Sequence, residues 1–234
     1  MVWIALGLGL LHGLGPDHLV AITALISRDP DPRRAALYGV RFGLGHMGTL
    51  TVFGLAGLVL KVAIPGTLER LGEVLGGVLL VMLGIMAAYE ALLGHRHPHS
   101  HLEGTPAGPQ SVSHSHWHRH PFGAHPGHGD EAQHARAHNH GPTALLVGGL
   151  FALSGLRSLL LMLPLTLAAS TLSTMAGYIL IFGLGIVLSM GVYGWLAAQA
   201  FTAAARTHPA LGAARTAAGL LSVAVGVYWV VSHW

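Results

Sequence analysis

Long apolar stretches separated by short polar segments dominate the chain. Six of them are long enough to cross a membrane as helices, because about 20 apolar residues span the hydrocarbon core. They cover residues 2–26, 36–64, 68–93, 143–169, 174–201 and 211–231. The runs are continuously apolar rather than alternating, which favours helices over the strands of a membrane barrel. The pattern predicts an all-α polytopic membrane protein, a bundle of about six transmembrane helices.

The third and fourth spans are separated by the one long connection in the chain. It divides the protein into residues 1–93, with three spans, residues 94–142, and residues 143–234, with three more spans. The connection holds thirteen of the eighteen histidines, together with frequent proline and glycine. Because it lacks the aliphatic residues needed for a core, we expect residues 94–142 to be disordered.

Composition places the chain in a lipid bilayer. Only 9% of its residues are charged, against about a quarter in a soluble domain, and its mean hydropathy is +0.59. The first apolar run is too long for a signal peptide and lacks a basic segment before it. A net charge of +3, without a basic run, gives no reason to expect a nucleic-acid partner. The absence of cysteine excludes disulfides, thiolate metal ligands and cysteine nucleophiles.

Basic residues gather in alternate connections. Those after the first, third and fifth spans hold Arg28, Arg33, Arg34, Arg96, Arg119, Arg136, Arg206 and Arg215. The opposite side carries only Lys61 and Arg70, beside Glu69 and Glu73. Positive-inside reasoning therefore predicts a cytoplasmic histidine-rich loop and both termini outside.

Glycines recur at helical spacing within the spans. The pairs Gly39 and Gly43, Gly72 and Gly76, and Gly191 and Gly194 are each three or four residues apart. Such pairs let membrane helices approach closely, so they predict a compact bundle.

The segment HGLGPDHLVAI sets polar residues near the middle of the first span. His12, Asp17 and His18 lie there, and His46 lies in the second span, within RFGLGHMGTL. Such groups are costly at membrane depth unless they line a cavity or pair with each other. On a straight helix, His12 and His18 would be about 240° apart. The intervening Gly-Leu-Gly-Pro predicts a broken helix that brings both imidazoles together and frees backbone carbonyls, as in many midplane ion sites.

These residues predict a divalent metal site made by His12, Asp17, His18 and His46. Imidazole and carboxylate without thiolate suit Ni²⁺, Co²⁺ or Zn²⁺, whereas Ca²⁺ and Mg²⁺ require more oxygen ligands. Taken alone, His46 is more typical of a hydrogen-bonded histidine that only packs between helices. Residues that could assist the site from other positions are Arg41, Met47, Glu90 and Arg157. Arg157 is expected to neutralise Asp17 or Glu90, and the fifth span could reach a cavity through Ser189, Met190 and Tyr193.

The histidine-rich connection predicts a second, weaker kind of metal binding. Histidine tracts bind divalent ions through neutral imidazole, with low selectivity where no fixed scaffold exists. We expect it to act as a metal reservoir, buffer or sensor. Its first eight histidines are His95, His97, His99, His101, His114, His116, His118 and His120.

HGLGPDH followed by LVAI, with GLGH in the next span, resembles the nickel/cobalt transporter superfamily. The signatures of that family are a histidine, a short spacer and an Asp-His pair in one helix, then a Gly-His in the following helix. The Pro-Asp-His ending is most similar to its urease-associated nickel permeases, and the long histidine-rich connection is similar to its efflux branch. The resemblance implies that His12, Asp17, His18 and His46 bind the transported ion in a prokaryotic plasma membrane.

The leading hypothesis is a secondary transporter that moves Ni²⁺ or Co²⁺, with Zn²⁺ as a further candidate ion, requires no cofactor and is not an enzyme. The sequence leaves the direction of transport open, with a slight preference for uptake. It contains no Walker motif for ATP hydrolysis. Two alternatives remain: an intramembrane zinc hydrolase built on the same residues, and a membrane metal sensor or storage protein that uses the loop alone.

Overall fold

Helices form almost all of the structure outside the histidine-rich connection. The computed structural model describes residues 1–27, 31–60, 65–93, 95–105, 108–118, 141–205 and 208–234. The α-helices are α1 (Val2–Gly13), α2 (Pro16–Ile26), α3 (Pro32–Leu60), α4 (Gly66–Leu93), α6 (Gly141–Phe151), α7 (Leu163–Leu167), α8 (Leu172–Ala204) and α9 (His208–His233). A 3₁₀ segment, η2 (Leu156–Met162), joins α6 to α7.

The predicted helical membrane bundle is confirmed. Four helices, α3, α4, α8 and α9, are each long and apolar enough to cross a membrane. Two further spans are broken: α1 and α2 meet at a bend of 57°, and α6 meets η2 and α7 at a bend of 67°. Counting each bent pair as one span gives the six spans that the hydrophobic pattern predicts. The break in the fourth span was not predicted.

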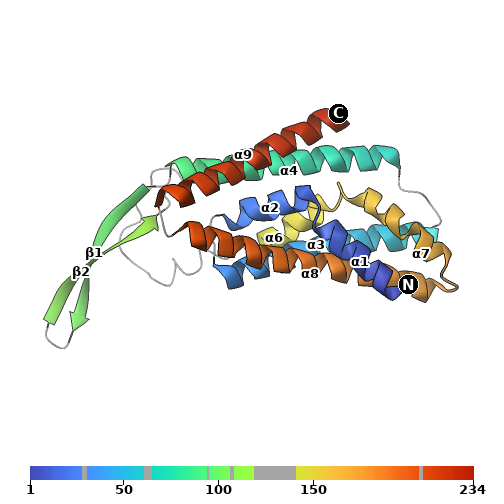
Figure 1. The fold of residues 1–234 in the computed structure, drawn as a ribbon, viewed down its shortest axis with the longest axis horizontal. Coiled ribbons are helices and arrows are strands. Elements are labelled where there is room, and N and C mark those ends of the chain that lie inside the picture. The colour runs from blue at the N-terminus through green and yellow to red at the C-terminus, as the bar shows by residue number, and fades with distance from the viewer. Residues whose placement is uncertain (28–30, 61–64, 94, 106–107, 119–140, 206–207) are drawn as a thin grey trace.

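The helices run alternately between two ends of an elongated molecule. Both termini lie at one end, which we call the terminal end, and the strands lie at the other, which we call the hairpin end (Figure 1). The predicted placement of the histidine-rich connection in the cytoplasm and of both termini outside stays a prediction. Several of the basic residues on which this prediction rests lie outside the described residues: Arg28, Lys61, Arg119, Arg136 and Arg206.

Part of the histidine-rich connection forms an antiparallel hairpin, where the sequence predicted disorder. Strands β1 (His95–Thr105) and β2 (Gly108–His118) pair so that His95 lies opposite His118, His97 opposite His116 and His99 opposite His114. Histidine at every second residue is the period-two pattern of a strand, which the frequent proline and glycine obscured. Residues 119–140, including His120, lie outside the described residues.

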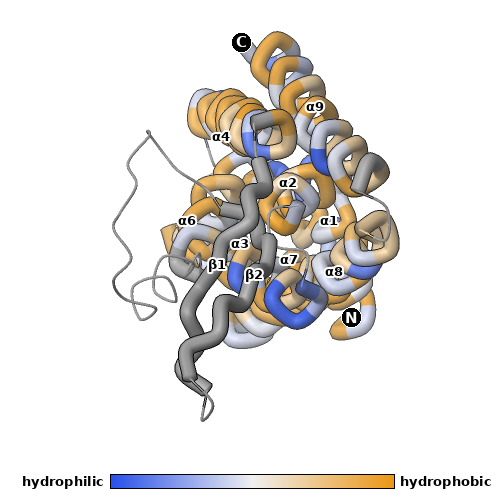
Figure 2. The backbone as a smooth tube through the Cα atoms, turned by 90° about the vertical axis from the view of Figure 1, so that its left-hand side faces the viewer, coloured by the Kyte–Doolittle hydropathy of each residue, from blue (hydrophilic) through white to orange (hydrophobic). Residues whose placement is uncertain are grey.

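Two pairs of long helices form the frame of the bundle. Helix α3 packs against α8, and α4 packs against α9, while α1 packs on α8 and α6 packs on α3. Seen from the hairpin end, α2 lies between the α4–α9 pair and the α3–α8 pair (Figure 2). The outer surface carries many exposed leucine and valine side chains, as a lipid-facing surface requires.

Glycines are the points at which these helices touch. A Cβ atom on Gly39 would overlap the backbone of Met190, one on Gly72 the carbonyl of Leu153, and one on Gly194 that of Ala35. The close approach predicted for the glycine pairs is therefore confirmed. The α4–α9 pair adds contacts that were not predicted, because Gly77 meets the backbone of Gly226 and Gly84 meets that of Gly219.

Substitution of two neighbouring glycines on α3 should separate packing from helix propensity. A Cβ on Gly45 would overlap the carbonyl oxygen of Leu145 on α6, whereas one on Gly48 would meet nothing. Gly45→Ala should lower stability by about 1–3 kcal/mol through overpacking. Gly48→Ala should leave it unchanged or raise it by up to about 1 kcal/mol. Thermal unfolding of the two purified variants in detergent measures the difference, and equal midpoints would contradict the close α3–α6 contact.

Candidate metal centre

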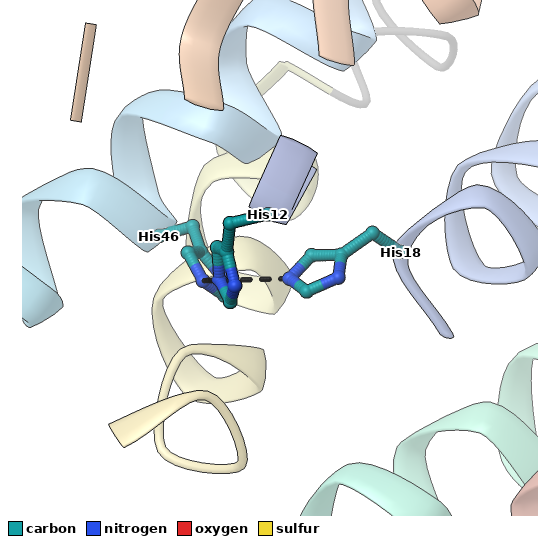
Figure 3. Close-up of side chains that lie close together, drawn as sticks. All are labelled: His12, His18 and His46. Carbon is teal, nitrogen blue, oxygen red and sulfur yellow. Dashed lines mark hydrogen bonds between the residues drawn. The ribbon is translucent and has the colours of Figure 1, made fainter. Parts of the chain in front are cut away.

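Three imidazoles converge where the first span breaks. His12 lies in the last turn of α1, His18 in the first turn of α2, and His46 in the middle of α3. The Nε2 atom of His46 lies 3.1 Å from Nε2 of His12 and 3.4 Å from Nε2 of His18. His18 and His46 are buried, while His12 is half-buried. The three rings point toward one another from three separate helices (Figure 3).

The break itself has a local cause. Pro16 occupies the first turn of α2, where its missing N–H leaves no hydrogen bond unmade. Gly15 precedes it as the N-cap, with φ −56° and ψ 140°, a conformation open to any residue. What glycine supplies here is space, because a Cβ would lie 2.7 Å from Oδ1 of Asp17 and 2.9 Å from Nδ1 of His18. Glycine and proline therefore bring His12 and His18 together, as predicted, although the left-handed backbone freedom of glycine is not used at Gly15.

Asp17 holds His18 from behind. Its Oδ1 accepts a hydrogen bond from Nδ1 of His18 at 3.0 Å, and its side chain is 13% exposed. When Nδ1 carries the proton, the lone pair of Nε2 faces His12 and His46. Carboxylate–histidine pairs of this kind commonly fix the orientation of a metal-binding imidazole. The structure engages one oxygen of Asp17 with His18, and the role of Asp17 as a direct metal ligand stays a prediction.

The backbone at the break is less open than predicted. The carbonyl of His12 accepts a hydrogen bond from the amide of Gly15, and that of Gly15 accepts one from Leu19. These two carbonyls are therefore already bonded within the chain. The donors that converge are nitrogens.

The spacing of these nitrogens fits one metal ion. At the metal–nitrogen distance of about 2.0–2.1 Å in zinc sites, the nitrogens of a tetrahedral set lie about 3.3 Å apart. The observed separations of 3.1 and 3.4 Å bracket that value, and the three ligand atoms all lie within 4.8 Å of one another. Three imidazoles could thus hold a borderline divalent ion and leave at least one coordination position open.

Aromatic rings enclose the three imidazoles. Phe42 stacks on His46 at 6.3 Å between ring centroids, Phe151 meets His18 edge-on at 5.4 Å, and Phe182 lies 5.6 Å from His12. All three phenylalanines are fully buried. They make the surroundings apolar, which strengthens electrostatic interactions between an ion and its ligands.

The second broken span reaches the same place. A Cβ on Gly155, between α6 and η2, would lie 3.3 Å from both Cε1 and Nε2 of His46. The two breaks in the bundle therefore meet at the imidazole cluster. The sequence did not predict this second break, because span four carries no proline or histidine there. The Ser154-Gly155 pair was the one local feature that could have indicated a bend.

Arg157 has different partners from those predicted. Its guanidinium lies 3.3 Å from Glu69 and 3.4 Å from Glu73, both on α4. The expected pairing with Asp17 or Glu90 was wrong, because η2 turns the arginine toward α4. The side chain of Arg157 is 63% exposed, and Glu73 also lies 3.6 Å from the imidazole of His233.

The other proposed accessory residues lie apart from the three imidazoles. Met47 packs against Gly183 on α8, and Glu90 lies in the last turn of α4 at the hairpin end. Arg41 is part-exposed on α3 and, within the described part of the chain, makes no hydrogen bond to the cluster.

Helix α8 does contribute polar groups beside the break. Ser189 lies against Gly13, and its hydroxyl donates to the carbonyl of Ile186. The hydroxyl of Tyr193 lies 2.6 Å from that of Thr23 on α2. Met190 is fully buried and lies against Gly43. Of the three residues expected to reach a cavity, Tyr193 makes the direct contact with α2.

Fold and site together define a polytopic helical membrane protein with an imidazole cluster at a helix break. The urease accessory protein UreH of Bacillus sp. (strain TB-90) is similar to this chain, with 28% identity over 224 residues. The match covers 95% of this chain and 87% of the relative. No family model matches the chain, and no solved structure matches it.

Neutralising Asp17 should weaken Ni²⁺ binding without removing a nitrogen ligand. In Asp17→Asn the amide oxygen can still accept the proton of His18, but the negative charge that would offset the charge of a bound ion is lost. We expect the Kd for Ni²⁺ to rise about 10- to 100-fold. Calorimetric titration of a chain whose loop histidines are replaced by asparagine measures this site alone. Glu73→Gln, which neutralises another buried carboxylate, is the matched control and should leave the Kd unchanged.

Proposed function

We propose that the protein is a secondary transporter that moves Ni²⁺, and also Co²⁺, across the membrane. The observation that carries the proposal is the convergence of three imidazole nitrogens at the break of a membrane span. Helices interrupted near the membrane midplane are a common way for transporters to hold an ion. The donor set, with nitrogen and no thiolate, suits borderline divalent ions rather than Ca²⁺ or Mg²⁺.

Two similarities support nickel in particular. The motifs around His12 and His46 resemble the nickel/cobalt transporter superfamily, and most of all its urease-associated permeases. The relative that matches nearly the whole chain is named a urease accessory protein. The resemblance to the urease-associated permeases favours uptake of the metal over efflux, and we favour that direction.

In this mechanism the ion exchanges water for imidazole. The nitrogens of His12, His18 and His46 take the place of part of its hydration shell, and Asp17 offsets part of its charge through His18. Phe42, Phe151 and Phe182 exclude further water from the site. The half-buried His12 and the open coordination position leave a route for the ion to arrive and depart.

An intramembrane hydrolase fits the site less well. A zinc hydrolase needs a group that accepts a proton from the metal-bound water as well as the metal ligands. Within the described residues, Asp17 is the one carboxylate bonded to an imidazole of the cluster, and it is engaged with His18. A sensor that uses the loop alone would leave the intramembrane cluster without a role.

Flux measurements test the transport proposal directly. Purified protein in liposomes should move Ni²⁺ down its gradient, as followed by a fluorescent metal indicator trapped inside. His12→Ala, His18→Ala and His46→Ala should each reduce the rate to that of empty liposomes, because two nitrogens hold the dehydrated ion too weakly. His233→Ala, which removes an imidazole elsewhere, should retain the native rate. If the native protein moves no Ni²⁺, Co²⁺ or Zn²⁺, the proposal is wrong.

The hairpin supports a second role, as a metal buffer. In the register of the two strands, three histidines of β1 lie directly opposite histidines of β2. We propose that these cross-strand pairs collect metal on the cytoplasmic side.

Deletion of residues 95–140 should separate the buffer from the pathway. We expect the shortened protein to keep the basal Ni²⁺ flux in liposomes but to bind fewer ions at equilibrium, as counted by equilibrium dialysis. The full-length chain with its loop histidines replaced by asparagine controls for the loss of the segment itself. Complete loss of flux in both variants would instead place the loop in the transport pathway.

A further inference from the structure

The two halves of the bundle repeat one arrangement. Each half consists of a broken span followed by two long helices: α1–α2, α3 and α4 in the first, and α6–η2–α7, α8 and α9 in the second. Helix α1 packs on α8 in the same way that α6 packs on α3, while α3 meets its counterpart α8 and α4 meets its counterpart α9. Because each half has three spans, the halves run in opposite directions through the membrane, as in inverted-repeat transporters.

Individual helix contacts also correspond between the two halves, as an approximate two-fold axis relating the halves requires. A Cβ on Gly9 of α1 would overlap the backbone of Phe182, and one on Gly148 of α6 would overlap that of Phe42. The sequence FGLG occurs at residues 42–45 and again at 182–185, at the centre of this relation. Residue numbers in α3 and α8 therefore correspond with an offset of 140.

The two breaks correspond as well. Gly15 is the N-cap of α2, and Gly155 is the N-cap of η2. The amide of Gly15 donates to the carbonyl of His12, and the amide of Gly155 donates to that of Ala152. Helix α2 and the segment η2–α7 are thus equivalent parts of the two halves, directed toward opposite ends of the bundle.

These equivalent parts are packed unequally. Helix α2 contacts α3, α8 and both members of the α4–α9 pair, and it exposes no large apolar side chain. The 3₁₀ segment η2 contacts α4 of that pair, and α7 packs mainly on η2 and α8. Four leucines of η2–α7 are 49 to 76% exposed: Leu160, Leu161, Leu163 and Leu167. The hairpin end is filled by α2, whereas its counterpart at the terminal end lies at the outside of the bundle.

We propose that α2 and η2–α7 are two alternating gates, and that this structure is the state closed at the hairpin end. The inference rests on the proposed transport function and adds which segments move. In the opposite state, η2–α7 packs between the frame pairs as α2 does here, and α2 withdraws. The imidazole cluster lies beside both breaks, so each gate separates it from one end when that gate is packed between the frame pairs.

A hydrogen bond holds the closed gate. Thr23 of α2 donates to the carbonyl of Leu19, which leaves its oxygen to accept from the hydroxyl of Tyr193 on α8. The equivalent positions in the other half are Leu163 on α7 and Phe53 on α3, and neither carries a hydroxyl. We call the hydrogen bond between Thr23 and Tyr193 the latch. It is present in one half only, and it favours closure at the hairpin end.

Cysteine labelling can follow the gate, because the natural chain contains no cysteine. Ala24 on α2 is 1% exposed, so Ala24→Cys should react slowly with a water-soluble maleimide present on both sides of proteoliposomes. Adding Tyr193→Phe removes the latch and should raise the labelling rate about 2- to 10-fold, the effect of losing one hydrogen bond. Tyr178→Phe, on the same helix, is the matched control and should leave the rate unchanged. Ala21→Cys serves as the probe if Ala24→Cys does not fold.

A latch transferred to the other half should act in the same direction. The double variant Phe53→Tyr/Leu163→Thr places the missing hydroxyls at the equivalent positions and should stabilise the state closed at the terminal end. Labelling at Ala24→Cys should then rise by a similar factor, and each single variant should have a smaller effect.

Unchanged labelling in both Tyr193→Phe and the double variant would overturn the two-gate proposal. Because labelling needs no metal, this outcome differs from failure of the transport function, in which the native protein moves no ion in the flux assay. A rise on removing Tyr193 without a rise in the double variant would show a latch on α2 but contradict the equivalence of η2–α7.

Discussion

Three imidazole nitrogens must meet inside an apolar bundle, and the rest of the structure follows from that requirement. On an unbroken helix, His12 and His18 would point in directions about 240° apart. The bend of 57° between α1 and α2 turns both toward His46. Polar groups at this depth are costly unless they bond to each other or to a ligand. Asp17 bonds to His18 and the imidazoles approach one another, so the polar groups of the cluster provide part of the hydrogen bonding that each of them requires.

The frame around the cluster leaves few parts free to move. Where α4 meets α9, glycine lies against glycine backbone at two levels, and Ser222 donates a hydrogen bond to the carbonyl of Leu80 between them. Helices in such contact cannot rotate without separating. Motion is therefore concentrated in the segments after the two breaks, which lack such a continuous contact along their length. This is why the gates are assigned to α2 and η2–α7 rather than to whole helices.

The sequence predicts the fold better than it predicts the details of the site. The six spans follow from apolar length alone, and Pro16 marks the first break. The second break lacks a proline at the equivalent place, so the apolar stretch continues across it and the sequence pattern gives no sign of a bend. The roles of Asp17 and Arg157 depend on the direction of their side chains. Asp17 lies beside His18 in the first turn of α2, and Arg157 pairs with two glutamates of α4, of which Glu69 is 88 residues away in the sequence. The repeated FGLG at 42–45 and 182–185 was readable, and it is the sequence trace of the two-fold relation.

The imidazole cluster breaks the symmetry of the frame that holds it. The positions equivalent to His18 and His46 are Ser158 and Ile186, so the second half carries no comparable ligand set. Both gates therefore serve one set of nitrogens. For a transporter of this design, the consequence is stoichiometric: each complete exchange of the gates carries a single metal ion, and the second half contributes motion rather than capacity.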